Sequence, residues 1–468
     1  MRRLGPVMAI VALVSFVAAA AGIDVRASYG ARTTGDEPYY LITAVTLWDD
    51  RDLDISDELD ANAFRDWHEI ALDEQTKPLE EGRRVSPHDP LLPILLAPAM
   101  ALGGWVGAKL FLALLGGVLA ALIVWIAVRR FAVSVAAAGL TAGIFGATAP
   151  FAVYGNQVYP ELPAALCVAV AVAGLSGRSG SALVSLGAAI TALPWLSIKY
   201  VPVAAALAAM AGVTLWRTGR RRALVGFASA LALMGMAFLV GHLRWYGGVT
   251  PYAVGDHFTS GEFSVIGNDP DYPGRARRLL GLLVDRNFGL VAWQPAWFLI
   301  VPAAVALVRA RPRGWLTLAI PLGVGWLNAT FIALTMQGWW WPGRQLVVVL
   351  PCAVLCIAWW VNRNRARFAT LALLGALGAV TLAWLVADGL ARRITWVVDF
   401  YDTTNPLYRV WRNLLPDYVD VTDTTWILHG AWFVVVLIMA IRTWKLTPPR
   451  GGERTPERVR SPASAGGL

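Results

Sequence analysis

The sequence predicts an all-α polytopic membrane protein with about 12 transmembrane helices and further juxtamembrane helices in its outer loops. Three observations predict this class. Hydrophobic residues make up 57% of the 468 residues and charged residues only 15%, which is typical of an integral membrane protein. Apolar runs long enough to cross a bilayer recur along the chain. Arginine clusters separate alternate runs, as the positive-inside rule expects of cytoplasmic loops.

The apolar runs define the predicted spans. The first follows Arg2-Arg3 and is interpreted as a retained span, with a cleaved signal peptide as the alternative. Pro87–Leu102 is apolar but too short to cross, so it predicts an interfacial or re-entrant helix. In order, the spans lie near residues 5–23, 105–128, 132–150, 160–176, 181–195, 198–216, 222–244, 288–308, 314–335, 344–361, 367–388 and 424–442.

The loops follow from a cytoplasmic amino terminus. The long segments 28–104, 246–287 and 389–423 then fall on the outer side, within one transmembrane domain of residues 1–446. The tail 447–468 is rich in proline, glycine and arginine and is predicted to be disordered in the cytoplasm. We expect a multi-pass protein of the plasma membrane whose active site faces the periplasm or the cell exterior.

Charge is divided unevenly along the chain. The net charge is +9, yet residues 32–89 contain 16 acidic and 6 basic residues. An acidic outer loop with basic inner loops explains this division. No lysine or arginine cluster alternates with aromatic residues, so we expect membrane lipids and no nucleic acid as partners. The three cysteines lie in apolar runs and predict neither disulfides nor a zinc site.

An acidic pair, Asp36-Glu37, follows the first span in the sequence Gly-Asp-Glu-Pro-Tyr-Tyr. Two carboxylates at a membrane surface are costly unless they bind a cation or move a proton. A partly desolvated carboxylate can act as a general base toward a hydroxyl. Asp36 and Glu37 together are also the candidate ligands of a divalent cation, Mg²⁺ or Mn²⁺. The alternative is that one carboxylate only caps the helix that begins at Pro38.

A second acidic run, Asp49–Asp54, lies farther along the same loop. We interpret this run as a solvated surface. Its spacing suits calcium, but it lacks the glycine and the closing glutamate of a calcium-binding loop.

Two cations at the outer ends of spans are candidate phosphate ligands. Lys199 lies in Leu-Pro-Trp-Leu-Ser-Ile-Lys-Tyr, against the positive-inside bias, and therefore needs an anionic partner. Arg344 follows Trp-Trp-Trp-Pro-Gly, and its planar guanidinium suits a phosphate. The alternative is an interfacial aromatic belt with a snorkelling arginine. Five further residues share this outer level: His88, Tyr159, Glu161, His257 and Arg286.

These motifs resemble those of polytopic glycosyltransferases with the C-type fold. The resemblance covers about residues 1–365. The superfamily includes the protein O-mannosyltransferases, the lipid A aminoarabinose transferases and the actinobacterial mannosyl- and arabinosyltransferases, and the actinobacterial type is the one expected here. The resemblance rests on Gly-Asp-Glu-Pro-Tyr-Tyr-Leu (35–41), Ser-Pro-His-Asp-Pro (86–90), Tyr-Pro-Glu (159–161), the Lys199 motif (193–200), Asp-Arg-Asn-Phe-Gly-Leu (285–290) before Gln294-Pro295, and Pro-Gly-Arg (342–344).

The resemblance implies a hexosyl- or pentosyltransferase that uses a sugar on a polyprenyl phosphate. Asp36 or Glu37 would deprotonate the acceptor hydroxyl of a glycan, lipid or protein, and the anomeric carbon would be inverted. Fixed cations stabilise the charge that grows on a leaving phosphate. The cations expected to do so are Lys199 and Arg344, with Arg286 or His88. The residues expected to contact the substrates are Tyr40, Tyr159, Glu161, His257 and Trp340.

Two other functions remain open. A transporter or flippase of lipid-linked sugars also needs charges at the membrane, but it predicts them at the mid-depth of several spans. Here the charged residues lie mostly at the ends of spans, which favours the enzyme. A non-catalytic scaffold that binds a cell-envelope enzyme through the outer loops is the third interpretation.

Overall fold

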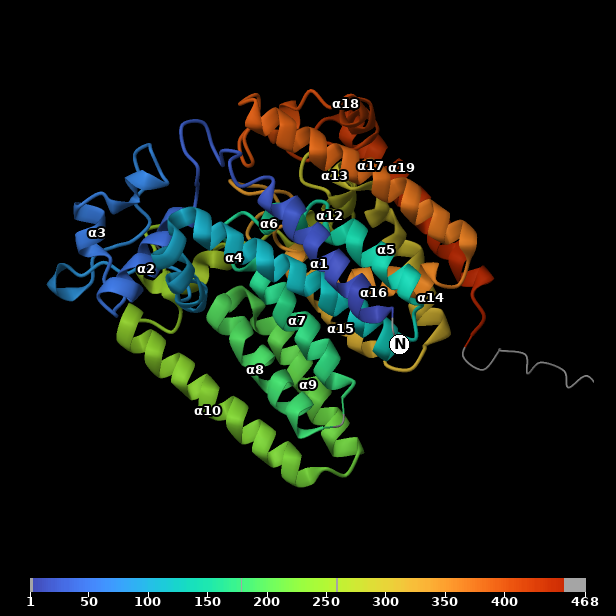
Figure 1. The fold of residues 1–468 in the computed structure, drawn as a ribbon, viewed down its shortest axis with the longest axis horizontal. Coiled ribbons are helices and arrows are strands. Elements are labelled where there is room, and N and C mark those ends of the chain that lie inside the picture. Colours follow the sequence, from blue (N-terminus) through green and yellow to red (C-terminus); the bar gives the residue numbers. More distant parts are fainter. Residues whose placement is uncertain (1–2, 178, 258–259, 450–468) are drawn as a thin grey trace, which may run out of the picture.

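The computed structural model describes residues 3–177, 179–257 and 260–449. It is 70% helical, and the described residues contain no β-strand, which confirms the all-α class. The predicted disordered tail lies outside the described residues from position 450 onward. Figure 1 shows the helices as a bundle, with α10 (Arg221–Tyr246) along one edge and α2 (Glu37–Asp49) and α3 (Ser56–Asp60) at one end.

Five apolar helices of the described chain are long enough to cross a membrane, by length and composition. Seven shorter apolar helices accompany them, and each of the twelve predicted spans coincides with one of these helices. The number of true membrane crossings stays a prediction. The long helices are α4 (Leu91–Phe131), α9 with its preceding turn (Ile198–Arg217), α10 with its following turn (Arg221–Val254), α17 (Arg365–Leu390) and α19 (Asp423–Leu446).

The shorter helices complete the bundle. The apolar ones are α1 (Leu4–Ala20), α5 (Val135–Gly146), α7 (Glu161–Leu175), α8 (Gly180–Leu196), α14 with a 3₁₀ turn (Pro295–Ala310), α15 with a π turn (Leu316–Ile332) and α16 with a 3₁₀ turn (Val347–Val361). The remaining short helices lie in connections: α6 (Phe151–Tyr154), α11 (Tyr272–Arg275), α12 (Arg278–Val284), α13 (Leu290–Trp293) and α18 (Pro406–Trp411).

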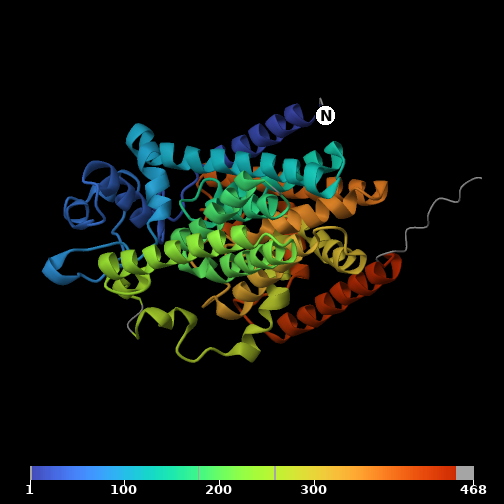
Figure 2. The ribbon, with the colours of Figure 1, turned by 90° about the horizontal axis from the view of Figure 1, so that it is seen from below.

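The helix α4 contains a sharp break. Gly103 and Gly104 leave the helical conformation, and Gly104 has a φ of 58°, which favours glycine. The light-blue to cyan ribbon bends sharply at this break (Figure 2). The segment before the glycines matches the predicted short helix at Pro87–Leu102, so the break separates this short helix from the second predicted span, which starts near Trp105.

Small residues allow α1 and α4 to pack closely. A Cβ atom at Gly117 would lie 2.7 Å from the backbone oxygen of Ala12, so only glycine permits this approach. The first polar loop therefore begins and ends at a pair of helices held side by side (Figure 1).

The three long outer segments assemble with one another. The backbone N–H of Lys77 donates to Val254 O at 2.8 Å, which joins the first segment to the second. The backbone N–H of Trp396 donates to Arg26 O at 2.8 Å, which joins the third segment to the chain just before the first. Segments far apart in the sequence thus form one ordered layer over the ends of the apolar helices.

Candidate active site

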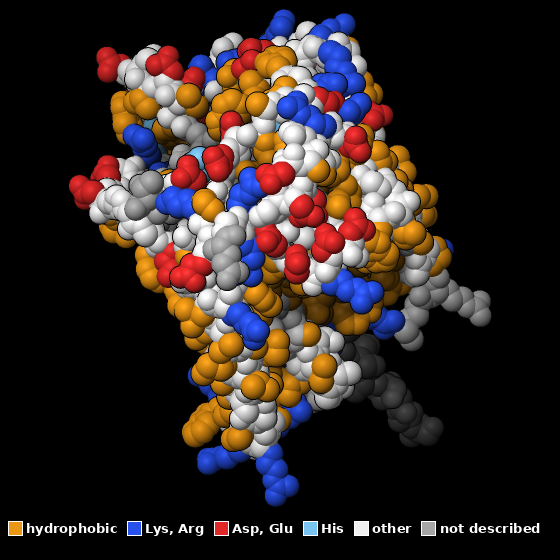
Figure 3. Space-filling model, turned by 90° about the vertical axis from the view of Figure 1, so that its left-hand side faces the viewer, with side chains coloured by type: hydrophobic (Ala, Val, Ile, Leu, Met, Phe, Trp, Pro, Cys, Tyr) orange, Lys and Arg blue, Asp and Glu red, His pale blue; other side chains and the backbone are white. Residues whose placement is uncertain are grey.

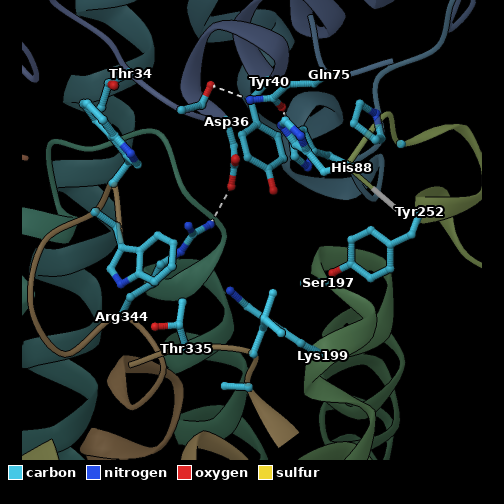
Figure 4. A pocket seen from close by; sticks show the side chains of 18 of the residues that line it. Thr34, Asp36, Tyr40, Gln75, His88, Ser197, Lys199, Tyr252, Thr335 and Arg344 are labelled. Carbon is cyan, nitrogen blue, oxygen red and sulfur yellow. Dashed lines mark hydrogen bonds and ion pairs between the residues drawn. The ribbon is translucent and has the colours of Figure 1, made fainter. Parts of the chain in front are cut away.

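A cavity of about 1040 Å³ lies between this layer and the helix ends. The start of α2 contributes Asp36 and Tyr40. The link that leads into α4 contributes His88. The turn before α9 contributes Lys199, and the link between α15 and α16 contributes Arg344. In Figure 4 Asp36, Tyr40 and His88 enter the cavity from above, and Arg344 and Lys199 lie below them.

A chain of ion pairs joins the cavity's charged side chains. Arg344 Nη2 lies 2.7 Å from Asp36 Oδ2, and its Nε lies 2.9 Å from Glu161 Oε1. Lys199 Nζ reaches the same Glu161 oxygen at 2.6 Å. Glu161 is fully buried at the first position of α7. It is therefore the anionic partner that the sequence required for Lys199, and it anchors both cations.

Both cations keep hydrogen-bonding capacity for a ligand. A guanidinium has five N–H donors and an ammonium has three. In the described chain, the hydrogen bonds of Arg344 use only Nε and Nη2, and Lys199 donates to Glu161 alone. The Arg344 guanidinium also lies 4.2 Å from the ring centre of Tyr159 and 5.1 Å from that of Trp340, which fixes its plane.

Burial and the neighbouring charges set the protonation of two groups in the cavity, Asp36 and His88. Burial alone would raise the pKa of Asp36, but the positive charge of Arg344 lowers it to about 2. Burial lowers the pKa of His88 to about 4, so the imidazole is neutral at pH 7. His88 stacks on Tyr40 with ring centres 4.6 Å apart, and its Nε2 lies 3.2 Å from Gln75 Oε1.

Glu37 lies next to Asp36 in sequence but does not line this cavity. Its carboxylate is fully buried and accepts hydrogen bonds from the backbone N–H groups of Val158 at 2.7 Å and Thr34 at 3.0 Å. Burial raises the pKa of Glu37, and the charge of Lys109 opposes that shift. The Asp36 side chain makes no cap hydrogen bond to α2, and both donors to Glu37 lie outside that helix.

The expected divalent cation at Asp36 and Glu37 does not fit this arrangement. The two carboxylates face different surroundings, one toward the cavity and the other into the protein. Arg344 holds Asp36, and two backbone N–H groups hold Glu37. A shared ion would have to displace these partners, so no step of the proposed reaction is assigned to a metal at this pair.

The other predicted site residues divide into three groups. Tyr40, His257 and Trp340 line the cavity together with His88. Tyr159 and Glu161 lie behind the cavity wall and support Arg344. Arg286 does not line the cavity; it pairs with Asp417 at 3.2 Å and holds the connection between α18 and α19.

Sequence reasoning missed several residues that build the site. Lys109 is fully buried within the apolar α4, and an ionisable residue in such a run was itself a signal. Asp89 and His242 form a buried pair at 3.0 Å, and Asp89 Oδ2 accepts the backbone N–H of Ile198 at 2.9 Å. This pair holds the turn that carries Lys199. Tyr252 lines the cavity from the second outer segment (Figure 4), and nothing in its local sequence indicated it.

No protein-family model matches the sequence, and no curated protein matches it either. The fold is similar to the crystal structure of ArnT from Cupriavidus metallidurans bound to undecaprenyl phosphate, with a TM-score of 0.53 and 14% sequence identity. The similarity covers 94% of this chain and 71% of the ArnT chain. The chain therefore shares the fold of that ArnT structure over most of its length.

Proposed function

We propose that the protein transfers a sugar from a polyprenyl-phosphate donor to an acceptor hydroxyl on the extracytoplasmic face of the plasma membrane. The observation that carries the proposal is the meeting of one carboxylate, Asp36, with two cations, Lys199 and Arg344, in one cavity. The bound undecaprenyl phosphate of the similar ArnT structure supports the same class of lipid phosphate.

The donor phosphate would bind the cations. Lys199 and Arg344 have unused donors at the cavity, and a guanidinium binds two phosphate oxygens at once. Apolar side chains on the same cavity, Val201, Ile332 and Leu334, are also exposed on the protein surface. This apolar edge suits a lipid chain that enters from the bilayer.

The reaction would be a single displacement. Asp36 accepts the proton of the acceptor hydroxyl while the hydroxyl oxygen bonds to the anomeric carbon, which inverts. The bond from that carbon to the phosphate oxygen breaks, and polyprenyl phosphate leaves with the electron pair. Lys199 and Arg344 stabilise the charge that grows on the phosphate. A phosphate on Arg344 also weakens the hold of that cation on Asp36, which makes the carboxylate a better base.

The test is a transfer assay with the full-length protein in lipid and a panel of polyprenyl-phosphate sugars. Asp36→Asn should lower the transfer rate by about 10²- to 10⁴-fold, the usual contribution of a general base, while polyprenyl phosphate still binds. Asp73→Asn is the matched control, because Asp73 lines the same cavity, is exposed and belongs to no ion pair in the described chain. Unchanged transfer in Asp36→Asn would exclude this mechanism. Movement of the lipid across the membrane without bond cleavage would indicate the flippase instead.

A further inference from the structure

A cluster of three carboxylates lies in the first outer loop, away from the cavity. Asp50 ends α2, and Asp57 and Glu58 belong to α3. One carboxylate oxygen from each residue lies within 4.8 Å of the others. Acidic side chains gather on this end of the molecule (Figure 3). Repulsion between like charges at this distance opposes the arrangement unless a cation or a shared proton offsets it.

Neighbouring carboxylates of the same loop are used differently. Asp52 accepts the backbone N–H of Asp54 at 3.0 Å, and Asp54 accepts the backbone N–H of Arg84 at 3.1 Å. These two side chains therefore hold the loop backbone. No lysine, arginine or histidine of the described residues forms an ion pair with Asp50, Asp57 or Glu58.

Glu58 gives an independent indication of a ligand. Its side chain is buried, with 7% of the residue exposed. Its Oε2 atom accepts no hydrogen bond in the described part of the chain. A buried carboxylate oxygen without a partner is costly, and one oxygen of the same Glu58 carboxylate belongs to the group whose oxygens converge. The loop thus holds an unsatisfied acceptor next to two exposed carboxylates.

We propose that Asp50, Asp57 and Glu58 bind a divalent cation of the Ca²⁺ type. Calcium takes six to eight oxygen ligands at about 2.3–2.6 Å, so two ligands of one ion lie at most about 5 Å apart. The observed spacing of 4.8 Å or less fits this limit. Three carboxylates offer up to six oxygens, and water can complete the shell because Asp50 and Asp57 are exposed. The ion would tie the end of α2 to α3, at the opposite end of α2 from Asp36.

Calorimetric titration of the full-length, EDTA-treated protein with CaCl₂ tests the site. We expect one saturable site with a dissociation constant on the order of 10⁻⁴–10⁻³ M, as for extracellular calcium modules, and a higher thermal midpoint with calcium. Glu58→Gln and Asp57→Asn should each weaken binding by about tenfold or more. Asp57 is exposed, so its substitution tests the site even if Glu58→Gln does not fold.

The matched control is Asp49→Asn, which removes the same charge from an exposed neighbour outside the cluster. This variant should bind calcium like the unmodified protein. The proposal is overturned if the unmodified protein shows no saturable binding at millimolar calcium. It is also overturned if Asp49→Asn weakens binding equally, which would indicate diffuse surface charge, or if neither cluster variant weakens it. These measurements are independent of transferase activity.

Discussion

Two clusters of charged side chains meet at the start of α2. Asp36 belongs to the cavity cluster, with Arg344, and its neighbour Glu37 belongs to the buried cluster, with Lys109. Asp36 faces a cavity and pairs with Arg344, whose remaining donors are open to a ligand. Glu37 points into the protein, where backbone N–H groups and the charge of Lys109 satisfy it. Neighbouring residues of a helix diverge by about 100°, so one acidic pair serves two clusters. Access to a ligand, not burial or charge, separates the candidate reactive group from the structural one.

Breaking the cavity cluster should have the largest effect. Arg344→Lys keeps the charge, but lysine cannot hold Asp36 and Glu161 with fixed, separate donors. We expect the transfer rate at saturating donor to fall by about 10²- to 10³-fold, as when a stabilising donor is removed from an active site. The thermal midpoint should change little.

Arg286→Gln is the comparison variant for Arg344→Lys. Both arginines were predicted to bind the donor phosphate, but Arg286 pairs with Asp417 outside the cavity. Replacing Arg286 can lower the fraction of folded protein, but the folded fraction should bind the donor with an unchanged KM. A similar rise in that KM for both variants would contradict the assignment of the cavity as the donor site.

Breaking the buried cluster should affect stability more than chemistry. Glu37→Gln replaces one carboxylate oxygen by an amide, which leaves a buried N–H of Thr34 or Val158 without its acceptor. The expected loss in the free energy of unfolding is about 1–3 kcal/mol, seen as a lower thermal midpoint. Adding Lys109→Met should recover part of this loss, because the variant no longer buries an unpaired ammonium. Abolished transfer with an unchanged midpoint would show instead that Glu37 is the reactive carboxylate.

The sequence predicted the positions of the apolar helices well, but it did not predict which charged side chains pair with one another. Continuous apolar runs located all twelve apolar helices of the described chain, because a long apolar run is a local property that can be read without the tertiary contacts. The unusual outer position of Lys199 also indicated an anionic partner correctly. Local patterns carry this kind of information without any knowledge of the tertiary contacts.

Roles that depend on distant segments could not be predicted. Asp36 and Arg344 are 308 positions apart, and nothing local distinguishes Asp36 from Glu37. Arg286 has the same type of motif as the cavity residues, but its partner Asp417 is 131 positions away. Asp50 belonged to a run interpreted as a solvated surface, and only the fold brings its carboxylate close to those of Asp57 and Glu58. In each case the side chain's environment is set by the packing of the three outer segments.

The smallest expected effect concerns pH and separates two neighbouring titratable groups of the cavity, His88 and Asp36. The pKa of His88 is lowered from 6.5 to about 4 by burial. As the pH falls below 6.5, the unfolded chain therefore binds this proton before the folded one does, and stability should decrease between pH 6.5 and 4. The pKa of Asp36 is instead lowered from 3.8 to about 2, so its contribution is lost only below about pH 4.

Thermal midpoints measured from pH 2 to 8 at constant ionic strength would resolve the two groups, because the Asp36 contribution is lost only below about pH 4. His88→Gln should flatten the decrease between pH 6.5 and 4, because glutamine does not titrate but can still donate to Gln75 Oε1. His257→Gln is the matched control, since His257 lines the same cavity but is exposed. If the decrease persists in His88→Gln and disappears in His257→Gln, the neutral imidazole beside Asp36 is not the group that weakens the fold in acid. The burial of His88 would then not account for the loss of stability in acid.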